Sequence, residues 1–223
     1  MRQVLVNLSP ESGTVFVDIG MNVGQTLLSV REALAGIDYI GFEPNPDCVS
    51  YVRKLVERNR LEEVRLICAG IGMTTSVKTL YSYSDAPGDS GASIVPDFRG
   101  CPHSRLSVFV IGAEIVTNLL RDEPVSIVKI DVEGGECEVL EALRGLLSEK
   151  RPHILMEILP NYNGSNKDRV ERQNRIEMLL QELEYGIFRI IKDSGNCLER
   201  LEQVDGFGFH SSLELCDYLL VPS

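Results

Sequence analysis

The sequence predicts an α/β fold with a mainly parallel, twisted sheet that helices cover on both faces. Three observations support this prediction. Short apolar segments alternate with amphipathic ones, a glycine-containing turn follows the first apolar segment, and acidic residues end several others. Strands that alternate with helices are typical of parallel sheets, because each parallel connection must cross over a face of the sheet.

The first strand and the first helix are separated by a turn with two glycines. Residues 15–19 are typical of a short buried strand, and residues 25–36 of a helix. Between them, Gly20, Asn22 and Gly24 permit a sharp change of direction. The N-terminus of a helix offers free N–H groups and positive potential, so this turn predicts a nucleotide-type binding site for an anionic ligand.

The later elements continue the alternation. Strands are expected at residues 37–44, 64–69, 77–83, 107–111, 125–131 and 153–158, and helices at residues 47–59, 136–147 and 170–184, with a short helix through Leu119 and Leu120. Three further strands, at residues 186–191, 197–201 and 218–221, predict antiparallel edge strands at the end of the chain. No repeat or linker interrupts this order, so we expect one domain over residues 1–223.

Composition restricts the class of protein. A chain of 223 residues, 43% of them apolar, is long enough for one domain with a full core. The net charge of −11 argues against direct binding to a nucleic-acid backbone. The six cysteines are scattered without a C-x-x-C pair, and the four in apolar or helical patterns, Cys48, Cys68, Cys137 and Cys216, are expected to be reduced, packed thiols. We see neither a signal pattern nor an apolar segment of membrane-spanning length, which predicts a cytoplasmic protein without a membrane partner.

One segment is irregular. Residues 84–105 contain several glycines and prolines and no periodic pattern. Because long loops in compact domains are usually functional, we expect this segment to be a lid or substrate loop.

Acidic residues end three of the expected strands: Asp18 the first, Glu43 the second and Asp131 a later one. In open α/β sheets, ligands bind beyond the carboxyl ends of the strands. Glu43 follows the glycine turn by about twenty residues, where a carboxylate typically binds a pair of ribose hydroxyls.

Two cofactors could use such a site. A dinucleotide requires G-x-G-x-x-G, but the turn has Asn22 between Gly20 and Gly24, so the spacing is wrong. S-adenosylmethionine has no pyrophosphate, and the Asn22 amide could bond its amino-acid end. Asp18 also suits a ligand that carries ammonium and sulfonium charges. The residues therefore favour a methyl donor over a nicotinamide dinucleotide.

A second acidic cluster lies in residues 128–136, which include Lys129, Asp131 and Glu133 and lead into a helix. Carboxylates that gather at one sheet edge repel one another, which can raise a pKa into the range of a general base.

The expected helix begins with Glu136 and Glu138, and Glu138 is interpreted as an acid of a solvated first turn. Glu157 ends the next central strand, where a carboxylate needs a partner or a role. The candidate catalytic residues are therefore Asp131, Glu133 and Glu157. An alternative mechanism places a divalent cation on Asp131 and Glu157.

Four segments, in this order, resemble the FkbM-type methyltransferases: residues 16–24, 42–46, 128–134 and 152–157. The ending at residues 217–222 is also similar to that family. The resemblance implies a Rossmann-like class I methyltransferase fold and transfer of a methyl group from S-adenosylmethionine to a hydroxyl of a sugar or polyketide-type product.

The resemblance also implies residue roles. Glu43 would hold the ribose, Asp131 and Glu133 would lie at the reacting edge, and Ser93 would face the cofactor or the acceptor. The methionine part would be held by Asp18, Gly20, Asn22 and Gly24.

We therefore expect an O-methyltransferase that acts on a small-molecule or glycan acceptor and uses Asp131 or Glu133 to accept the hydroxyl proton. The alternatives are a nicotinamide-dependent oxidoreductase and a non-catalytic module that binds S-adenosylmethionine.

Overall fold

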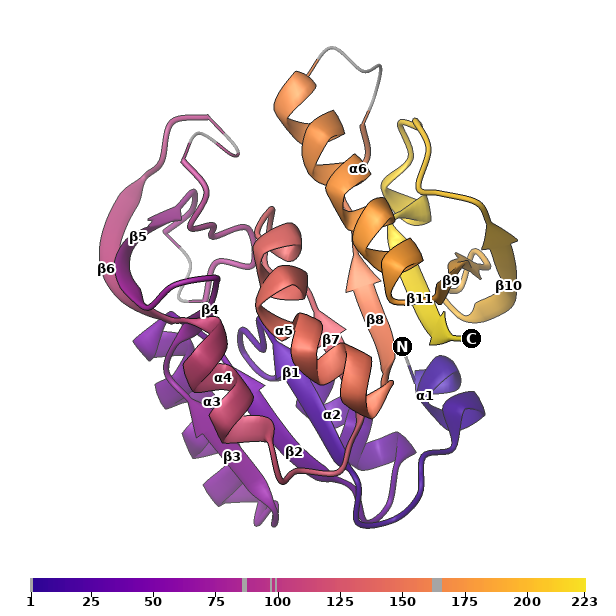
Figure 1. Ribbon diagram of the computed structural model, residues 1–223. Helices are drawn as coiled ribbons and strands as arrows, with labels where there is room; N and C mark the ends of the chain where they lie inside the picture. Colours follow the sequence, from indigo (N-terminus) through magenta and orange to yellow (C-terminus); the bar gives the residue numbers. More distant parts are fainter. Residues whose placement is uncertain (1, 86–87, 97, 99, 162–165) are drawn as a thin grey trace.

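A computed structural model describes residues 2–85, 88–96, 98, 100–161 and 166–223. Its centre is an eight-stranded sheet with the strand order β10-β9-β11-β8-β7-β1-β2-β3 (Figure 1). The strands are β1 (Val15–Ile19), β2 (Asp38–Phe42), β3 (Val64–Ile67), β7 (Val125–Ile130), β8 (His153–Glu157), β9 (Tyr185–Lys192), β10 (Leu198–Val204) and β11 (Asp217–Pro222).

The strands of this sheet are parallel on one side and antiparallel on the other. From β3 through β2, β1 and β7 to β8, all neighbours are parallel. β11 runs antiparallel to both β8 and β9, and β10 runs antiparallel to β9. The α/β fold with a mainly parallel sheet and antiparallel C-terminal strands is confirmed.

Helices cover both faces of the sheet. The helices are α1 (Arg2–Leu8), α2 (Gln25–Ala33), α3 (Pro46–Asn59), α4 (Ala113–Leu120), α5 (Glu136–Lys150) and α6 (Lys167–Glu182), with a 3-10 turn at Leu213–Leu215. Buried side chains of α1, α2 and α3 form one hydrophobic cluster with the sheet, and those of α4, α5 and α6 form another. The alternating apolar residues of the buried strands supply both clusters.

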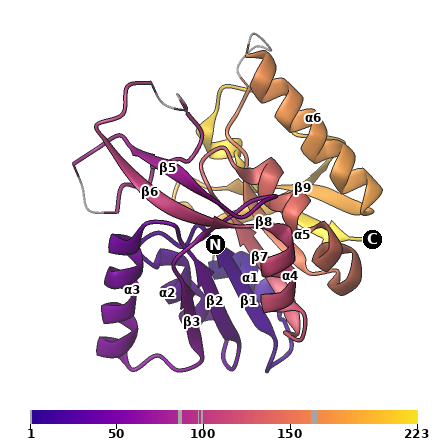
Figure 2. The same cartoon turned by 60° about the vertical axis from the view of Figure 1, so that its left-hand side comes forward.

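A second, three-stranded sheet has the order β4-β6-β5. It consists of β4 (Gly70–Ile71), β5 (Ser76–Ser82) and β6 (Ser104–Ile111), and β5 and β6 form an antiparallel pair. The strands expected at residues 77–83 and 107–111 therefore exist, but they pair with each other outside the central sheet. Figure 2 shows this small sheet above the ends of β1, β2 and β3.

Several element boundaries differ from the prediction. α2 ends at Ala33 because Leu34 is already extended, and α6 begins at Lys167 because the Asn166 side chain caps it by accepting from Arg169 N. β6 begins at Ser104, so the irregular segment is shorter than predicted. α1 was not predicted, and its Val4 and Leu5 are buried in the core.

Candidate functional site

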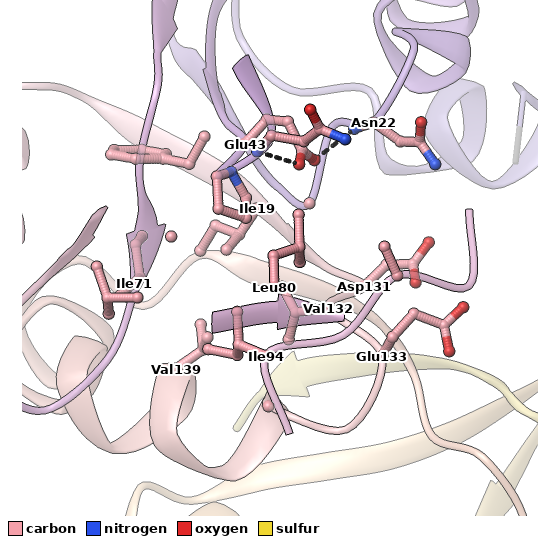
Figure 3. Close-up of a pocket in the computed structure, with 18 of the residues that line it drawn as sticks. Ile19, Asn22, Glu43, Ile71, Leu80, Ile94, Asp131, Val132, Glu133 and Val139 are labelled. Atoms are coloured by element: carbon pink, nitrogen blue, oxygen red, sulfur yellow. Dashed lines mark hydrogen bonds between the residues drawn. The ribbon is translucent and has the colours of Figure 1, made fainter. Parts of the chain in front are cut away.

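A pocket of about 660 Å³ lies at the carboxyl ends of the central parallel strands. Its wall is formed by the glycine turn, the residues after β2, parts of β4 and β5, most of residues 89–96, the segment after β7 and the end of β8 (Figure 3). The predicted site residues that line it are Gly20, Asn22, Glu43, Asp131, Glu133 and Glu157. The sequence thus located the pocket at the correct edge of the sheet, as the rule for open α/β sheets requires.

The glycine turn approaches the neighbouring strand very closely. Gly20 has φ +85°, and a Cβ atom there would lie 1.8 Å from the backbone oxygen of Asp131. Asn22 has φ +45°, a conformation that Asn adopts more readily than most residues. Gly24 has φ +83° and precedes the first residue of α2. Glycine at position 20 is therefore required for the turn to pass beside the end of β7.

Glu43 connects the glycine turn to the loop after β2. Its carboxylate accepts hydrogen bonds from Asn22 N at 3.0 Å and Asn45 N at 2.9 Å (Figure 3). Burial raises the pKa of Glu43 to about 6, although the two N–H groups act in the opposite direction. The carboxylate is thus fixed in the pocket wall, in a position suited to binding hydroxyl groups.

Asp18 does not line the pocket. Its side chain is fully buried, accepts a hydrogen bond from the Tyr39 hydroxyl and lies 3.4 Å from Lys129 Nζ. The prediction of a direct contact between Asp18 and a ligand is therefore corrected, because Lys129 separates this carboxylate from the pocket. Gly24 also lies outside the wall and acts through the shape of the turn.

Ser93 is the second correction. It is buried, and its hydroxyl donates to the Glu133 carbonyl oxygen at 2.6 Å and accepts from Val95 N at 3.0 Å. Its neighbours Ala92 and Ile94 line the pocket, but Ser93 itself does not. The resemblance placed Ser93 against cofactor or acceptor, whereas its side chain points to the backbone behind the pocket.

The irregular segment also contacts the pocket edge through Phe98. A Cβ atom on Gly134 would lie 2.5 Å from the Phe98 ring, so the absence of a side chain at position 134 makes room for this contact. On the other side, the Arg169 guanidinium of α6 lies over the same ring at 5.1 Å from its centre. The Phe98 ring therefore lies against both the turn after β7 and α6.

The three candidate catalytic carboxylates all line the pocket. Figure 3 shows the side chains of Asp131 and Glu133 on the same side. Glu133 has φ +52° in the tight turn after β7. Burial raises the pKa of Glu157 to about 7, and the nearby carboxylates of Asp131 and Asp217 contribute.

Glu138 was interpreted as a solvated first-turn acid, and this was wrong. Glu138 lines the pocket and forms an ion pair with Arg172 of α6, which lines it as well. No local pattern could have revealed this pair, because α5 and α6 meet only in the folded chain. Lys129, noted in the sequence but given no role, also lies in the pocket wall.

Within the described ranges, no group of three or more His, Cys, Asp and Glu side chains is arranged to hold a metal ion. Likewise, none of the helices built from described residues is long and apolar enough to cross a membrane.

A family model for the methyltransferase FkbM domain matches residues 18–187. No curated protein matches the sequence. Among solved structures, the chain is similar to the methyltransferase FkbM of Methylobacillus flagellatus KT, with 14% identity and a TM-score of 0.58 over 96% of this chain. The chain covers only 45% of the length of that structure.

Two further similar structures have names that mention different molecules, SAH in one and rRNA in the other. SMU.1697c from Streptococcus mutans, solved in complex with SAH, has 8% identity and a TM-score of 0.53, with 98% of this chain and 94% of that chain covered. An rRNA methylase from Streptococcus thermophilus has 12% identity and a TM-score of 0.50, with coverage of 98% and 90%. At these identities the likeness shows the fold alone, and the expected exclusion of nucleic acid gains no support from it.

Proposed function

The chain belongs to the FkbM methyltransferase family, and on this premise we propose that it transfers a methyl group from S-adenosylmethionine to a hydroxyl of a small-molecule or glycan acceptor. The observation that carries the proposal is the hydrogen bond by which Asn22 N of the glycine turn donates to the Glu43 carboxylate. Both border one pocket of about 660 Å³ at the carboxyl ends of the parallel strands.

The residues present fit this cofactor. The Gly20 turn leaves no side chain between β1 and β7, and the first residues of α2, Gln25 and Thr26, line the pocket beside it. These groups and Asn22 would hold the amino-acid end, and Glu43 would accept from the ribose hydroxyls. S-adenosylmethionine supplies an electrophilic methyl group attached to a sulfonium leaving group.

Pocket charge agrees with a cationic cofactor. Glu43, Asp131 and Glu133 all line the pocket, so several carboxylates face the space in which a sulfonium would lie. A pyrophosphate, by contrast, would meet these negative charges at short range, which disfavours a dinucleotide.

On the acceptor side, we propose that residues 84–105 act as a lid over the acceptor and that the fold operates as a single catalytic domain. The lid would hold the hydroxyl in line with the methyl group, and such alignment supplies much of the rate of a transfer to a good leaving group. One of the carboxylates of Asp131, Glu133 and Glu157 would accept the hydroxyl proton.

Calorimetry on the purified chain with S-adenosylmethionine, S-adenosylhomocysteine and NAD tests the cofactor. We expect micromolar binding of the first two and none of NAD, followed by methyl transfer in a screen of sugars and hydroxylated natural products. Binding of NAD alone would overturn the proposal in favour of an oxidoreductase. Binding of S-adenosylmethionine without transfer to any acceptor, an RNA oligonucleotide panel included, would indicate a non-catalytic module.

A further inference from the structure

Lys129 lies between two carboxylates at the inner wall of the pocket. Its Nζ is 3.1 Å from Asp131 Oδ2 and 3.4 Å from Asp18 Oδ1, and its side chain is only 10% exposed. Burial lowers the pKa of Lys129, but Asp18 and Asp131 raise it by more, so the net shift is upward. Lys129 is therefore a permanent cation, and it forms an ion pair with Asp131.

Asp18 is held in turn by the Tyr39 hydroxyl, which donates to Asp18 Oδ2. Tyr39 and Asp18 are both fully buried. The series Tyr39, Asp18, Lys129 and Asp131 thus runs from the core to the pocket, and each member restrains the next. A carboxylate restrained and ion-paired in this way is a poor proton acceptor, because protonation would break the pair.

Glu157 has a different environment in the same pocket. Across the described part of the chain, its carboxylate forms no hydrogen bond and no ion pair. The charged groups that face it are Asp131 and Glu133 from the turn after β7, Lys129 from β7 and Asp217 from β11. Asp217 is opposite Glu157 in the strand register and is itself paired with Lys192.

We propose that Lys129 divides the roles of these two carboxylates: it holds Asp131 in an ion pair, and Glu157 is the general base. The inference rests on the proposed methyl transfer. As the acceptor oxygen forms its bond to the methyl carbon, the methyl–sulfur bond breaks with its electron pair left on sulfur, and the hydroxyl proton passes to a Glu157 carboxylate oxygen. Lys129 is a positioning residue in this scheme.

The environment of Glu157 agrees with that role. Its pKa of about 7 lies near the optimum for a general base at neutral pH. Glu136 has a similarly raised pKa of about 7, but it does not line the pocket, and its carboxylate accepts from Gly134 N. Glu136→Gln is therefore a matched control for Glu157→Gln.

A first experiment needs no acceptor. The full chain labelled with ¹³C at the Glu and Asp carboxyl carbons is titrated by NMR, with each resonance assigned from its loss in Glu157→Gln, Glu136→Gln or Asp131→Asn. We expect the Glu157 resonance to titrate near pH 7. Titration of Glu157 below pH 5 would overturn the inference.

A second experiment uses the acceptor found in the screen. The kcat of the wild type should fall below a midpoint near pH 7. Glu157→Gln should lower kcat about 100-fold or more and abolish this limb, while leaving the Kd of S-adenosylhomocysteine within about threefold. Glu136→Gln should keep the limb. A limb that persists in Glu157→Gln and disappears in Asp131→Asn would assign the base to Asp131 instead.

The role of Lys129 is tested with two variants. The double variant Asp18→Asn, Lys129→Gln should lower kcat about tenfold or more while leaving the Kd of S-adenosylhomocysteine within about threefold, and Lys129→Arg, which keeps the cation, should recover most of this loss. The double variant avoids leaving Asp18 buried without its cation. An unchanged kcat in the double variant would remove Lys129 from the scheme. Failure of the wild type to bind S-adenosylmethionine or to transfer methyl would instead refute the proposed function.

Discussion

The Ser93 hydroxyl donates a 2.6 Å hydrogen bond to the carbonyl oxygen of Glu133, forty residues further along the chain. This bond ties the irregular segment between β5 and β6 to the turn that carries the pocket carboxylates. Because Ser93 also accepts from Val95 N, one buried hydroxyl satisfies two backbone groups. The position of the pocket edge depends on this contact.

Replacement of Ser93 by Ala should therefore destabilise the protein by about 1–2 kcal/mol, since it leaves the partly buried N–H of Val95 and the partly buried carbonyl of Glu133 without their partner. Urea unfolding measures the change, with Ser90→Ala, at an exposed position of the same segment, as the control. Equal stability of the two variants would show that the Ser93 hydroxyl does not hold the segment.

Replacement of Gly20 by Ala should cost at least about 2 kcal/mol and abolish cofactor binding. The added Cβ would meet the Asp131 carbonyl oxygen at 1.8 Å, in a backbone conformation with φ +85°. Gly145→Ala is the control, because Gly145 is exposed in α5 and a Cβ there has no neighbour within 4 Å. That variant should stabilise the protein by about 1 kcal/mol through helix propensity. Thermal unfolding and calorimetry distinguish these outcomes.

Replacement of Glu43 by Gln should weaken binding of S-adenosylhomocysteine about tenfold or more. The amide leaves one of the two N–H groups of Asn22 and Asn45 without an acceptor and removes the charge that would face the ribose. Calorimetry measures the change, and Glu57→Gln on the exposed side of α3 is the control. Unchanged affinity in Glu43→Gln would place the ribose elsewhere.

The pH dependence of stability should reveal Glu136. Burial raises its pKa from an ordinary 4.5 to about 7, so its stabilising contribution is complete below about pH 4.5 and is lost as pH rises to about 7. The Glu136→Gln variant has no carboxyl group at this position, so it does not lose this stability as pH rises. The stability difference between variant and wild type should therefore shift in favour of the variant by roughly 1–2 kcal/mol between pH 5 and pH 8. Urea unfolding at both pH values measures it, and a constant difference would contradict the assignment.

Removal of divalent metal should leave methyl transfer unchanged. Lys129 Nζ already lies 3.1 Å from Asp131 Oδ2, where the alternative mechanism would place a metal ion. The measurement is the transfer rate after dialysis against EDTA, compared with the rate after readdition of magnesium. A rate that disappears in EDTA and returns with magnesium would establish the metal-dependent mechanism instead.

The sequence was sufficient for the features that depend on short stretches of chain. Alternating apolar segments predicted the α/β order, and the parallel centre followed from the need for crossover connections. The glycine turn predicted where a ligand site would form, because free N–H groups at a helix start depend on residues adjacent in sequence. The sequence also placed Glu43, Asp131 and Glu157 at this site, because the strand ends of a parallel sheet share one edge.

Tertiary structure decided the features that depend on where side chains point and on which segments meet. Asp18 alternates with its neighbours along β1, but only the packing of Tyr39 and Lys129 shows that it faces the interior. Ser93 and Glu133 are forty residues apart and meet through the fold of the segment between β5 and β6. The pair of Glu138 and Arg172 forms across two helices. The spacing of apolar residues along the chain predicts which face of a helix or strand is buried. These contacts depend instead on distances between elements, which no local pattern encodes.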